Sequence, residues 1–370
     1  MKILHVAHES VFTQMAYALF NSISSVKNDF VIVTDKSKTS FNIICKTITQ
    51  KELLSRPFIN TLHDYDVIII HQMHRYKVQL VNLAPKSAKI VWIGWSCDYY
   101  REGCIETPLL LPKTKRFFLK YMTIFDRILF LARKFRSLLA RDRFHYRRAA
   151  RRADIFCPVL PNEFKLVKNA IPGFNAKHII WNYGESAKLS EKPLPITGND
   201  ILLGNSAAIE NNHIEAIDIL KGLKLEKQKV ICPLSYGCTN NTDFIIEYGN
   251  NLLGDSFTPL TDFMQPNEYW RKLQSCRYVI MNHLVQEGMG NIIHTLRMGC
   301  SLFLQKTNPV YTYLKNNDIF FFDIDELKEN TDLRHFNLLD TQILSNQKII
   351  NALYSSETYL SNTKRLIDSL

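Results

Sequence analysis

The sequence has no pair of cysteines at CxxC spacing, although it contains eight cysteines. They are scattered, and several lie in apolar runs, which is typical of buried thiols in a reducing compartment rather than of disulfides or a zinc site. No window of about 18 residues is free of charge, so we expect no transmembrane helix. The apolar stretch Lys2–Ala7 is too short, and too soon followed by His8 and Glu9, to be a signal peptide.

Acidic residues are almost missing from one segment, and this segment accounts for the positive charge of the chain. The net charge is +11, whereas residues 113–152 alone contain 14 Lys or Arg and two acids. Apolar residues in this segment recur at helical spacing. The basic residues between them include Lys120, Arg127, Arg133, Lys134 and Arg136. A cationic amphipathic helix of this kind suits the surface of an anionic bilayer.

Two other interpretations of residues 113–152 stay open. The same positive field would attract nucleic acid, but no recognisable nucleic-acid fold or aromatic RNP-type motif accompanies it. A core helix with a solvated basic face would also show this pattern. We carry the membrane surface forward as the predicted partner, and we predict no nucleic acid partner.

Short apolar runs alternate with helical patterns along most of the chain, which is typical of doubly wound α/β domains. The continuous run Asp66–His71 is of the kind that is buried in a parallel sheet. The alternation stops over 184–199, which contains prolines and glycines, and then restarts. We therefore predict an N-terminal Rossmann-like domain (1–183, with the basic segment 113–152), a linker (184–199), a second Rossmann-like domain (200–340) and C-terminal helices (341–370).

Ligands in open α/β sheets bind beyond the carboxyl ends of the strands. In the first domain Asp98 follows the run ending at Gly94, and it is a candidate general base for a hydroxyl nucleophile. The alternative is a helix-capping aspartate. Trp95 and Tyr99 flank it and could stack on sugars.

Residues after two earlier strands belong to the same predicted edge. His8 and Glu9 follow the first strand and would face the same ligand, although a solvated loop is equally compatible with them. His71 and His74 suggest a metal site, but no third ligand is placed by the sequence, so we predict no metal.

In the second domain the stretch 286–299 reads as a glycine turn that opens a helix. Gly288 and Gly290 let the backbone approach a ligand closely, and free N–H groups at the helix start would bind phosphate. An ordinary tight turn is the alternative. Asn205 and Ser206 end an earlier strand and could contact a phosphate, and Tyr236 could stack on a base.

Several motifs occur in the order of one known family. The stretch Gly204–Ser206, followed by Asn212–Ala216, resembles the GNS…N-x-H-I-x-A signature of the 4-acetamido-4,6-dideoxygalactose transferases, glycosyltransferase family 56. Pro233–Gly237 and Gln286–Asn291 are similar to later motifs of that family. Trp92–Trp95, with the aspartate that follows, resembles an earlier motif more loosely. The similarity extends over residues 90–325.

The resemblance implies a GT-B fold and an inverting transfer that needs no metal or cofactor. It implies a dTDP-linked deoxyamino sugar as donor and an undecaprenyl-diphosphate-linked saccharide as acceptor, at the cytoplasmic face of the bacterial inner membrane. It places the donor on the second domain, with Glu287 and Asn291 as the side chains nearest to it. Asp98 would be the base, with Glu9 second. The acceptor would contact Trp95, Tyr99, His8 and His74.

Ser96 and Cys97 depart from the family motif that precedes the aspartate, so the donor sugar is less firmly implied than the reaction class. Two other functions remain compatible with the sequence. One is a non-catalytic protein that binds membrane surfaces or nucleic acid. The other is a GT-B sugar-nucleotide epimerase, which would leave the cationic helix unexplained.

Overall fold

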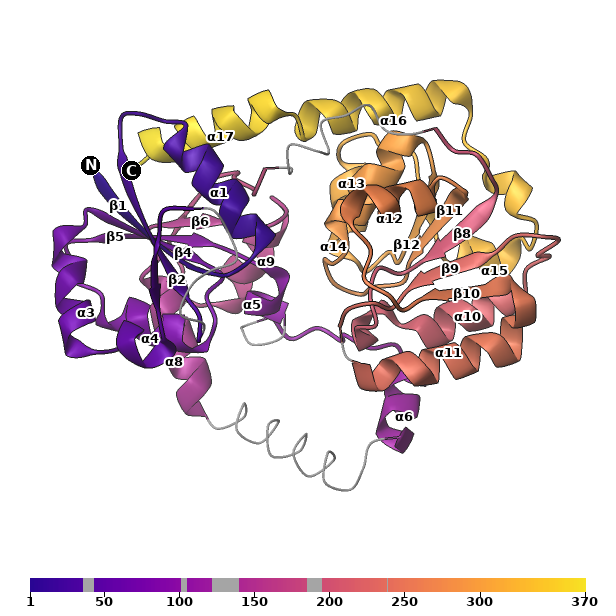
Figure 1. The fold of residues 1–370 in the computed structure, drawn as a ribbon, viewed down its shortest axis with the longest axis horizontal. Coiled ribbons are helices and arrows are strands. Elements are labelled where there is room, and N and C mark those ends of the chain that lie inside the picture. Colours follow the sequence, from indigo (N-terminus) through magenta and orange to yellow (C-terminus); the bar gives the residue numbers. More distant parts are fainter. Residues whose placement is uncertain (36–42, 101–104, 122–139, 185–194, 238) are drawn as a thin grey trace. The chain divides into compact units, whose positions relative to one another are not determined.

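The computed structural model describes residues 1–35, 43–100, 105–121, 140–184, 195–237 and 239–370 (Figure 1). The chain divides into two compact units. Unit 1 comprises Met1–Thr107, Ile128–Ser190 and Tyr354–Leu370, and unit 2 comprises Pro108–Arg127 and Glu191–Leu353. Each unit contains one parallel sheet with helices on both faces, so the predicted α/β architecture of two Rossmann-like domains is confirmed.

The units differ from the expected domain ranges in two places. Residues 108–121, where the basic segment begins, pack within unit 2, although the sequence predicts them in the N-terminal domain. The last residues, from Tyr354, pack within unit 1 and do not form a separate C-terminal part. Both differences depend on which helix faces meet, and the order of the elements along the chain does not determine this.

Unit 1 is built on a seven-stranded sheet in the order β3-β2-β1-β4-β5-β6-β7. Every residue of the apolar β4 run Val-Ile-Ile-Ile-His is buried, because helices cover both faces of a parallel sheet. The order reverses between β1 and β4, so the carboxyl ends of these two strands flank a topological switch point. The strands are β1 (Lys2–His8), β2 (Lys27–Val33), β3 (Lys46–Ile48), β4 (Val67–His71), β5 (Lys89–Ile93), β6 (Ile155–Cys157) and β7 (Lys177–His178).

Helices α1 and α17 cover one face of this sheet, where Phe20 and Leu366 pack against its apolar residues. Ser10 caps α1 by accepting a hydrogen bond from the Thr13 N–H. On the other face α4 packs against α8. The helices of unit 1 are α1 (Val11–Asn21), α2 (Gln50–Leu53), α3 (Arg56–Thr61), η1 (Leu62–Asp64), α4 (Arg75–Leu83), α5 (Ser96–Tyr100), α8 (Ala140–Arg151), α9 (Glu163–Ala170) and α17 (Ser356–Asp368).

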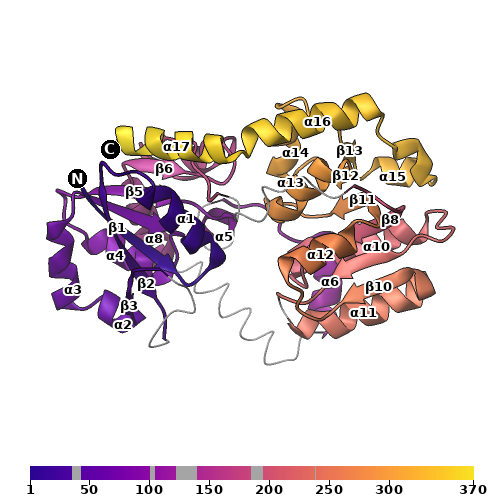
Figure 2. The same ribbon diagram turned by 45° about the horizontal axis from the view of Figure 1, so that its top comes forward.

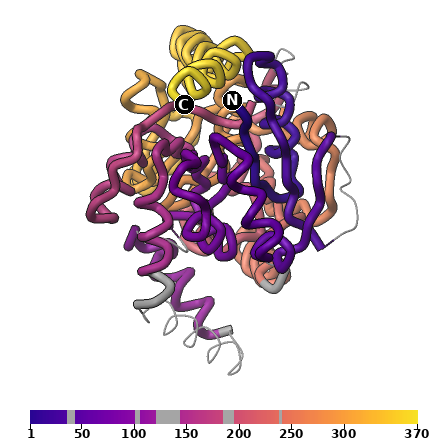
Figure 3. The backbone as a smooth tube through the Cα atoms, turned by 90° about the vertical axis from the view of Figure 1, so that its left-hand side faces the viewer, coloured from indigo at the N-terminus to yellow at the C-terminus, as the bar shows by residue number. Residues whose placement is uncertain are grey.

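The C-terminal helix is fixed to unit 1 by a buried polar contact. Trp181 Nε1 donates to Thr363 Oγ1 over 3.0 Å. Lys89 Nζ also donates to the Leu370 carbonyl oxygen. The two termini consequently lie on the same side of unit 1, as Figures 2 and 3 show.

Unit 2 has a six-stranded parallel sheet in the order β10-β9-β8-β11-β12-β13. Its switch point lies between β8 and β11, which pair directly. The strands are β8 (Asp200–Leu203), β9 (Val230–Pro233), β10 (Phe257–Leu260), β11 (Cys276–Met281), β12 (Ser301–Leu304) and β13 (Phe322–Asp323). Alternate residues of these strands point to opposite faces, so Ile201 and Leu203 join the core beneath α10 and α11.

The same core includes residues of α15 and η4, while α13 packs against α16. The helices of unit 2 are α6 (Pro112–Tyr121), η2 (Ile209–Asn211), α10 (His213–Lys221), α11 (Thr239–Leu253), η3 (Gly254–Ser256), α12 (Pro266–Leu273), α13 (Met289–Met298), α14 (Pro309–Lys315), α15 (Glu326–Glu329), η4 (Leu333–Phe336) and α16 (Asp340–Leu353).

Helix α6 is attached to unit 2 by polar and aromatic contacts. The Leu111 N–H donates to Asn212 Oδ1 over 2.7 Å. The Thr114 N–H donates to the Glu215 carboxylate over 2.8 Å. The Phe117 ring lies 3.6 Å from the Phe244 ring, centroid to centroid. The first turns of the basic segment are therefore part of the surface of unit 2.

Candidate functional site

The predicted donor residues gather at the switch point of unit 2. Asn205 and Ser206 follow β8, and the loop that leads to Gly288 follows β11. Because β8 and β11 are neighbours, these two loops lie side by side at the carboxyl edge of the sheet. Tyr236, in the turn after β9, joins them through its hydroxyl, which accepts a hydrogen bond from Asn205 Nδ2 over 3.0 Å.

The turn after β8 is closed by the side chain of Asn211. Asn211 Oδ1 accepts from the Asn205 N–H over 2.9 Å, and Asn211 Nδ2 donates to Ser206 Oγ over 3.2 Å. Gly204 has φ +68°, and a Cβ there would lie 2.6 Å from Asn211 Oδ1, so only glycine fits. Ser206 is buried and already bonded inside the turn, so its hydroxyl is held by the fold.

Asn205 carries a polar atom that the described residues leave without a partner. Its Oδ1 atom is buried and accepts no hydrogen bond from them. Gly288 lies beside it, since a Cβ at Gly288 would be 3.4 Å from Asn205 Cγ. The side chain of Tyr236, which is hydrogen-bonded to Asn205, is 56% exposed. An amide acceptor, an aromatic face and a glycine backbone thus converge at one point.

Helix α13 begins at this point, and no side chain among the described residues caps its amino terminus. Gly288 is its N-cap residue, has φ +69° and offers no side chain to accept from the first N–H groups. A Cβ at Gly290 would meet no atom within 4 Å, so the first turn is open on that side. Exposed N–H groups at a helix start bind anions, because the helix dipole adds to their partial charges.

Glu287 and Asn291 frame the start of α13. Glu287 Oε2 lies 3.9 Å from Nε2 of the buried His283. Asn291 Nδ2 donates to Tyr269 Oη over 3.1 Å. Burial raises the pKa of Tyr236, the hydrogen bond from Asn205 lowers it, and the nearby Glu287 carboxylate raises it. The Tyr236 hydroxyl therefore stays protonated at neutral pH.

Unit 1 presents its own set of polar residues at the switch point between β1 and β4. His8 ends β1 and Glu9 follows it, and both are half-buried. His8 Nδ1 lies 3.0 Å from Tyr76 Oη. Burial lowers the pKa of His8 to about 3, helped by Lys77 and His74, so its ring is neutral. His74 follows β4 and is also half-buried.

The loop after β4 is strained. Gln72 has φ +65° and Arg75 has φ +29°. Residues other than glycine rarely adopt positive φ, because their Cβ atom then clashes with the backbone. Asp98 holds the loop, since its Oδ2 accepts from the Met73 N–H over 2.9 Å. Lys77, fully buried, donates from Nζ to the His71 carbonyl oxygen. Lys77 was not predicted as a site residue, because a lysine among helical residues gives no signal of burial.

Asp98 itself is 1% exposed. Besides the Met73 N–H, the same Oδ2 accepts from Trp92 Nε1 and from the Trp95 N–H, each over 3.0 Å. Burial raises the pKa of Asp98 to about 6, and these hydrogen bonds lower it in part. A carboxylate that is enclosed and bonded in this way holds the loops after β4 and β5, and it lacks the exposure that a general base needs to reach an acceptor.

Tyr99 and Trp95, the two predicted acceptor aromatics, differ in the structure. Tyr99 is fully buried and donates from Oη to Glu163 over 2.8 Å, so its ring belongs to the core and offers no face to a sugar. Trp95 is half-buried, and its Nε1 donates to Tyr183 Oη over 2.9 Å. Tyr183 was not predicted as a site residue, because it stands next to the expected linker.

The basic segment is described only at its ends. Lys120 is exposed on α6, whereas Arg127, Arg133, Lys134 and Arg136 lie outside the described residues. Helix α8, which ends the segment, carries the exposed Phe144 and Arg148. None of the helices that the structure describes combines the length and apolar character needed to traverse a bilayer.

His71, which the sequence placed near a possible metal, is instead buried among hydrogen-bond partners. Its Nε2 lies 3.1 Å from His5 Nδ1, and its Nδ1 lies 3.0 Å from Tyr183 Oη. Within the described ranges, no three His, Cys, Asp or Glu side chains are grouped as a metal site would require.

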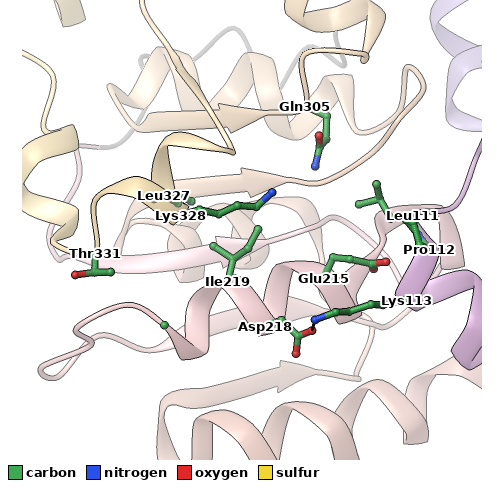
Figure 4. A pocket seen from close by; sticks show the side chains of 11 residues that line it. Leu111, Pro112, Lys113, Glu215, Asp218, Ile219, Gln305, Leu327, Lys328 and Thr331 are labelled. Carbon is green, nitrogen blue, oxygen red and sulfur yellow. Dashed lines mark hydrogen bonds and ion pairs between the residues drawn. The ribbon is translucent and has the colours of Figure 1, made fainter.

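A pocket of about 590 Å³ lies elsewhere on unit 2, against α10 and α15 (Figure 4). Its lysines already form ion pairs within the chain. Lys113 pairs with Asp218, and Lys328 Nζ lies 2.5 Å from Asp325 Oδ1. None of the predicted site residues lines it. The residues that do are Leu111, Pro112, Lys113, Glu215, Asp218, Ile219, Gly222, Gln305, Leu327, Lys328 and Thr331.

Comparison with known proteins finds a similar family and a similar fold. A family model described as 4-alpha-L-fucosyltransferase, glycosyl transferase group 56, matches residues 184–362, a range that contains every predicted donor residue. Among solved structures, Anabaena HepE in complex with UDP-glucose is similar at 14% identity and TM-score 0.66, with 100% of both chains covered.

Two further solved structures agree. Sucrose-phosphate synthase from Thermosynechococcus elongatus matches at 10% identity and TM-score 0.64, covering 100% of this chain and 99% of that one. The lipopolysaccharide outer core galactosyltransferase WaaB matches at 11% identity and TM-score 0.65, covering 100% and 98%. At these identities the likeness establishes the fold, which is GT-B.

Proposed function

Because this chain is a glycosyltransferase similar to group 56 and has the GT-B fold, we propose that it transfers a deoxyamino sugar from a dTDP-linked donor to a saccharide carried on a lipid diphosphate. The observation that carries the donor half of this proposal is the bare amino terminus of α13 beside Asn205 and Tyr236. HepE, which shares the fold, is described in complex with UDP-glucose, and this supports a nucleotide-sugar as donor.

Each of the donor residues is assigned to a different part of the nucleotide-sugar. The N–H groups of Gly290 and Asn291, in the first turn of α13, bind the diphosphate and stabilise the charge that develops on it as it leaves. The exposed ring of Tyr236 stacks on the base. The Oδ1 atom of Asn205, which the described residues leave without a partner, accepts a hydrogen bond from the donor.

The acceptor hydroxyl must lose a proton as it attacks the anomeric carbon of the sugar, with inversion and without a metal. Glu9 is the group that we assign to this step, because it is half-buried at the switch point of unit 1. Asp98, the first candidate from the sequence, keeps a supporting role by holding Met73 and Trp95 in place. His8, His74 and Trp95 contact the acceptor.

Paired substitutions decide between the two carboxylates. Glu9→Gln should lower turnover by orders of magnitude with the fold intact, since removal of a general base typically costs about 10²–10⁴-fold. Asp98→Asn preserves the size and an acceptor oxygen of the side chain, so it should retain most of the turnover. The opposite result would return the role of base to Asp98.

The basic segment holds the enzyme at the cytoplasmic face of the bacterial inner membrane, where a lipid-linked acceptor resides. Lys113, Lys115 and Arg116 are exposed on α6 together with Lys120, which supports this assignment. Sedimentation with vesicles tests it. Binding should require anionic lipid and should weaken with salt, as expected for about 1 kcal/mol per basic residue near the surface. Equal binding to neutral vesicles would contradict it.

Product analysis with a panel of nucleotide-sugars and a short lipid-diphosphate saccharide tests the reaction itself. Thermal shift gives the donor preference beforehand. A ligand at 100 times its Kd raises the unfolding free energy by about 2.7 kcal/mol, so dTDP should stabilise the protein more than UDP at equal concentration. A protein that responds to neither nucleotide would exclude the proposed donor site.

A further inference from the structure

A chain of five polar side chains runs through unit 1 and ends at Trp95. His5 Nε2 lies 3.1 Å from Asn28 Oδ1, and His5 Nδ1 lies 3.1 Å from His71 Nε2. His71 Nδ1 lies 3.0 Å from Tyr183 Oη, which accepts from Trp95 Nε1 over 2.9 Å. We call Asn28, His5, His71, Tyr183 and Trp95 the hydrogen-bond relay.

The chemistry of the two ends fixes the direction of every hydrogen bond in the relay. Asn28 Nδ2 donates to the Phe20 carbonyl oxygen over 3.1 Å, so its Oδ1 faces His5 and must accept. His5 therefore carries its proton on Nε2. Its Nδ1 is then an acceptor in the neutral ring, so the bond to His71 uses a proton on His71 Nε2.

The tautomer of His71 fixes the two remaining hydrogen bonds, those of Tyr183. With its proton on Nε2, neutral His71 accepts at Nδ1, so the Tyr183 hydroxyl donates to it. The Tyr183 oxygen can then accept from Trp95 Nε1, which is a donor only. Each hydrogen bond therefore points from Trp95 toward Asn28, and chains of this kind strengthen each bond by polarising the next.

This order of hydrogen bonds requires that the imidazole rings of His5 and His71 are both neutral. Burial lowers the pKa of His5 to about 3, opposed by the hydrogen bond to Asn28 and by the nearby Asp29 carboxylate. Burial also lowers the pKa of His71 well below its usual value, and His5, Lys77 and His8 lower it further. A second proton on His5 would place two donors face to face, at His5 Nδ1 and His71 Nε2. A second proton on His71 would remove the acceptor of the Tyr183 hydroxyl.

The relay determines which part of the Trp95 side chain can contact a ligand. Its only polar group, the indole N–H, is turned inward to Tyr183. The rings of Phe12 and Tyr183 stand nearly perpendicular to the Trp95 ring, at interplanar angles of 80° and 85°. Phe12 is 46% exposed and Trp95 is half-buried, so the cluster meets solvent with aromatic carbon.

We propose that the relay positions Trp95 so that its ring, and not its N–H group, meets the acceptor saccharide. An aromatic ring whose N–H group is already bonded favours the apolar C–H face of a pyranose. It discriminates against a sugar with an axial hydroxyl on that face, because this hydroxyl would lose its bound water without gaining a hydrogen bond to the ring. This inference rests on the proposed function, in which Trp95 contacts the acceptor. His5, His71 and Tyr183 are positioning residues in this scheme.

Tyr183→Phe tests the proposal, because it removes one oxygen and keeps the ring. Tyr100→Phe is the matched control, since Tyr100 is also buried in unit 1 and donates from Oη to Glu163 over 2.8 Å. In Tyr183→Phe the KM for the acceptor should rise about tenfold, the equivalent of one lost hydrogen bond, while the KM for the donor stays unchanged. Tyr100→Phe should change neither KM.

Nuclear magnetic resonance of protein labelled with 15N histidine and 15N tryptophan provides a readout that does not depend on activity. His5 and His71 should both be neutral Nε2–H tautomers at pH 7, and the Trp95 indole N–H signal should shift in Tyr183→Phe. His71→Gln is the conservative rescue, because its amide can accept from Tyr183 and donate to His5. It should retain the acceptor KM, whereas His71→Leu should not.

The outcomes separate the two proposals. A charged histidine, or an Nδ1–H tautomer at either position, would overturn the relay. An unchanged acceptor KM in Tyr183→Phe, with active wild-type enzyme, would overturn the role of the relay in acceptor binding. Wild-type protein that transfers no sugar, while both histidines are Nε2–H tautomers, would refute the proposed function and leave the proton order of the relay intact.

Discussion

Replacing Gly290 with alanine separates the donor site from the stability of the fold. Gly290 lies in the first turn of α13, and a Cβ there would meet no atom within 4 Å. The added methyl group therefore causes no clash within the protein. Glycine costs about 0.5–1 kcal/mol relative to alanine inside a helix. For a unit of this size, the substitution should raise Tm by about 1–4 °C.

The effect on the donor should have the opposite sign. If the diphosphate rests against the first turn of α13, the new Cβ of residue 290 occupies part of its space and moves it away from the N–H groups. A hydrogen bond from a neutral donor to a charged acceptor contributes about 1.5–3 kcal/mol. Loss of one such bond corresponds to roughly a tenfold to hundredfold weaker affinity for the donor.

Two measurements and one control complete the experiment. Calorimetric titration with dTDP gives the affinity, and thermal unfolding gives Tm. Gly222→Ala is the control, because Gly222 ends α10 with φ −78° and lies outside the donor loops. It should leave the affinity for dTDP unchanged. A Gly290→Ala protein that is folded and binds dTDP normally would show that the diphosphate does not rest on α13.

Three further predictions concern unit 1 and the basic segment. Burial raises the pKa of Glu163 from 4.5 to about 7, so the folded state binds its proton more readily. The contribution of Glu163 to the unfolding free energy should therefore fall by up to about 3 kcal/mol as pH rises from 4.5 to 7, and the pH dependence of Glu163→Gln should differ from that of the wild type by this amount; identical pH dependence in the two proteins would contradict the assignment. Asp98→Ala leaves three buried N–H donors without an acceptor and should lower the unfolding free energy in denaturant titration by about 3 kcal/mol or more; a smaller loss would mean that water replaces the carboxylate. Reversing the charges of the exposed Lys115, Arg116 and Lys120 to glutamate should abolish sedimentation with anionic vesicles while the affinity for dTDP persists; undiminished sedimentation would assign the membrane contact to another surface.

Local signals in the sequence were sufficient for most strands of the two sheets and for the turns that carry the predicted donor residues. The run Asp66–His71 predicts a buried parallel strand because all of its central side chains are apolar, and β4 is buried throughout. Gly204 predicts a turn because it stands where an apolar run ends, and Gly288 predicts one because it precedes a helical pattern; both have positive φ. Since the order of strands places their carboxyl ends together, residues far apart in sequence, such as Asn205 and Gly288, could be expected at one site.

Which polar residues remain exposed could not be read from the sequence. Asp98 and Glu9 both follow strands and look alike there, but Asp98 is enclosed by Met73, Trp92 and Trp95, whereas Glu9 is half-buried. The difference arises because the loops after β4 and β5 fold over the same carboxylate, and a one-dimensional pattern carries no record of that.

The sequence by itself determined two α/β units, the position of most strands and the glycine turns, since hydrophobic period and turn chemistry act over a few residues. Only the tertiary structure decided that α6 packs on unit 2, that α17 returns to unit 1, and that His71 joins His5 to Tyr183. These contacts depend on the packing of surfaces from distant segments. Their energies come from burial and from hydrogen bonds that exist only once those surfaces have met.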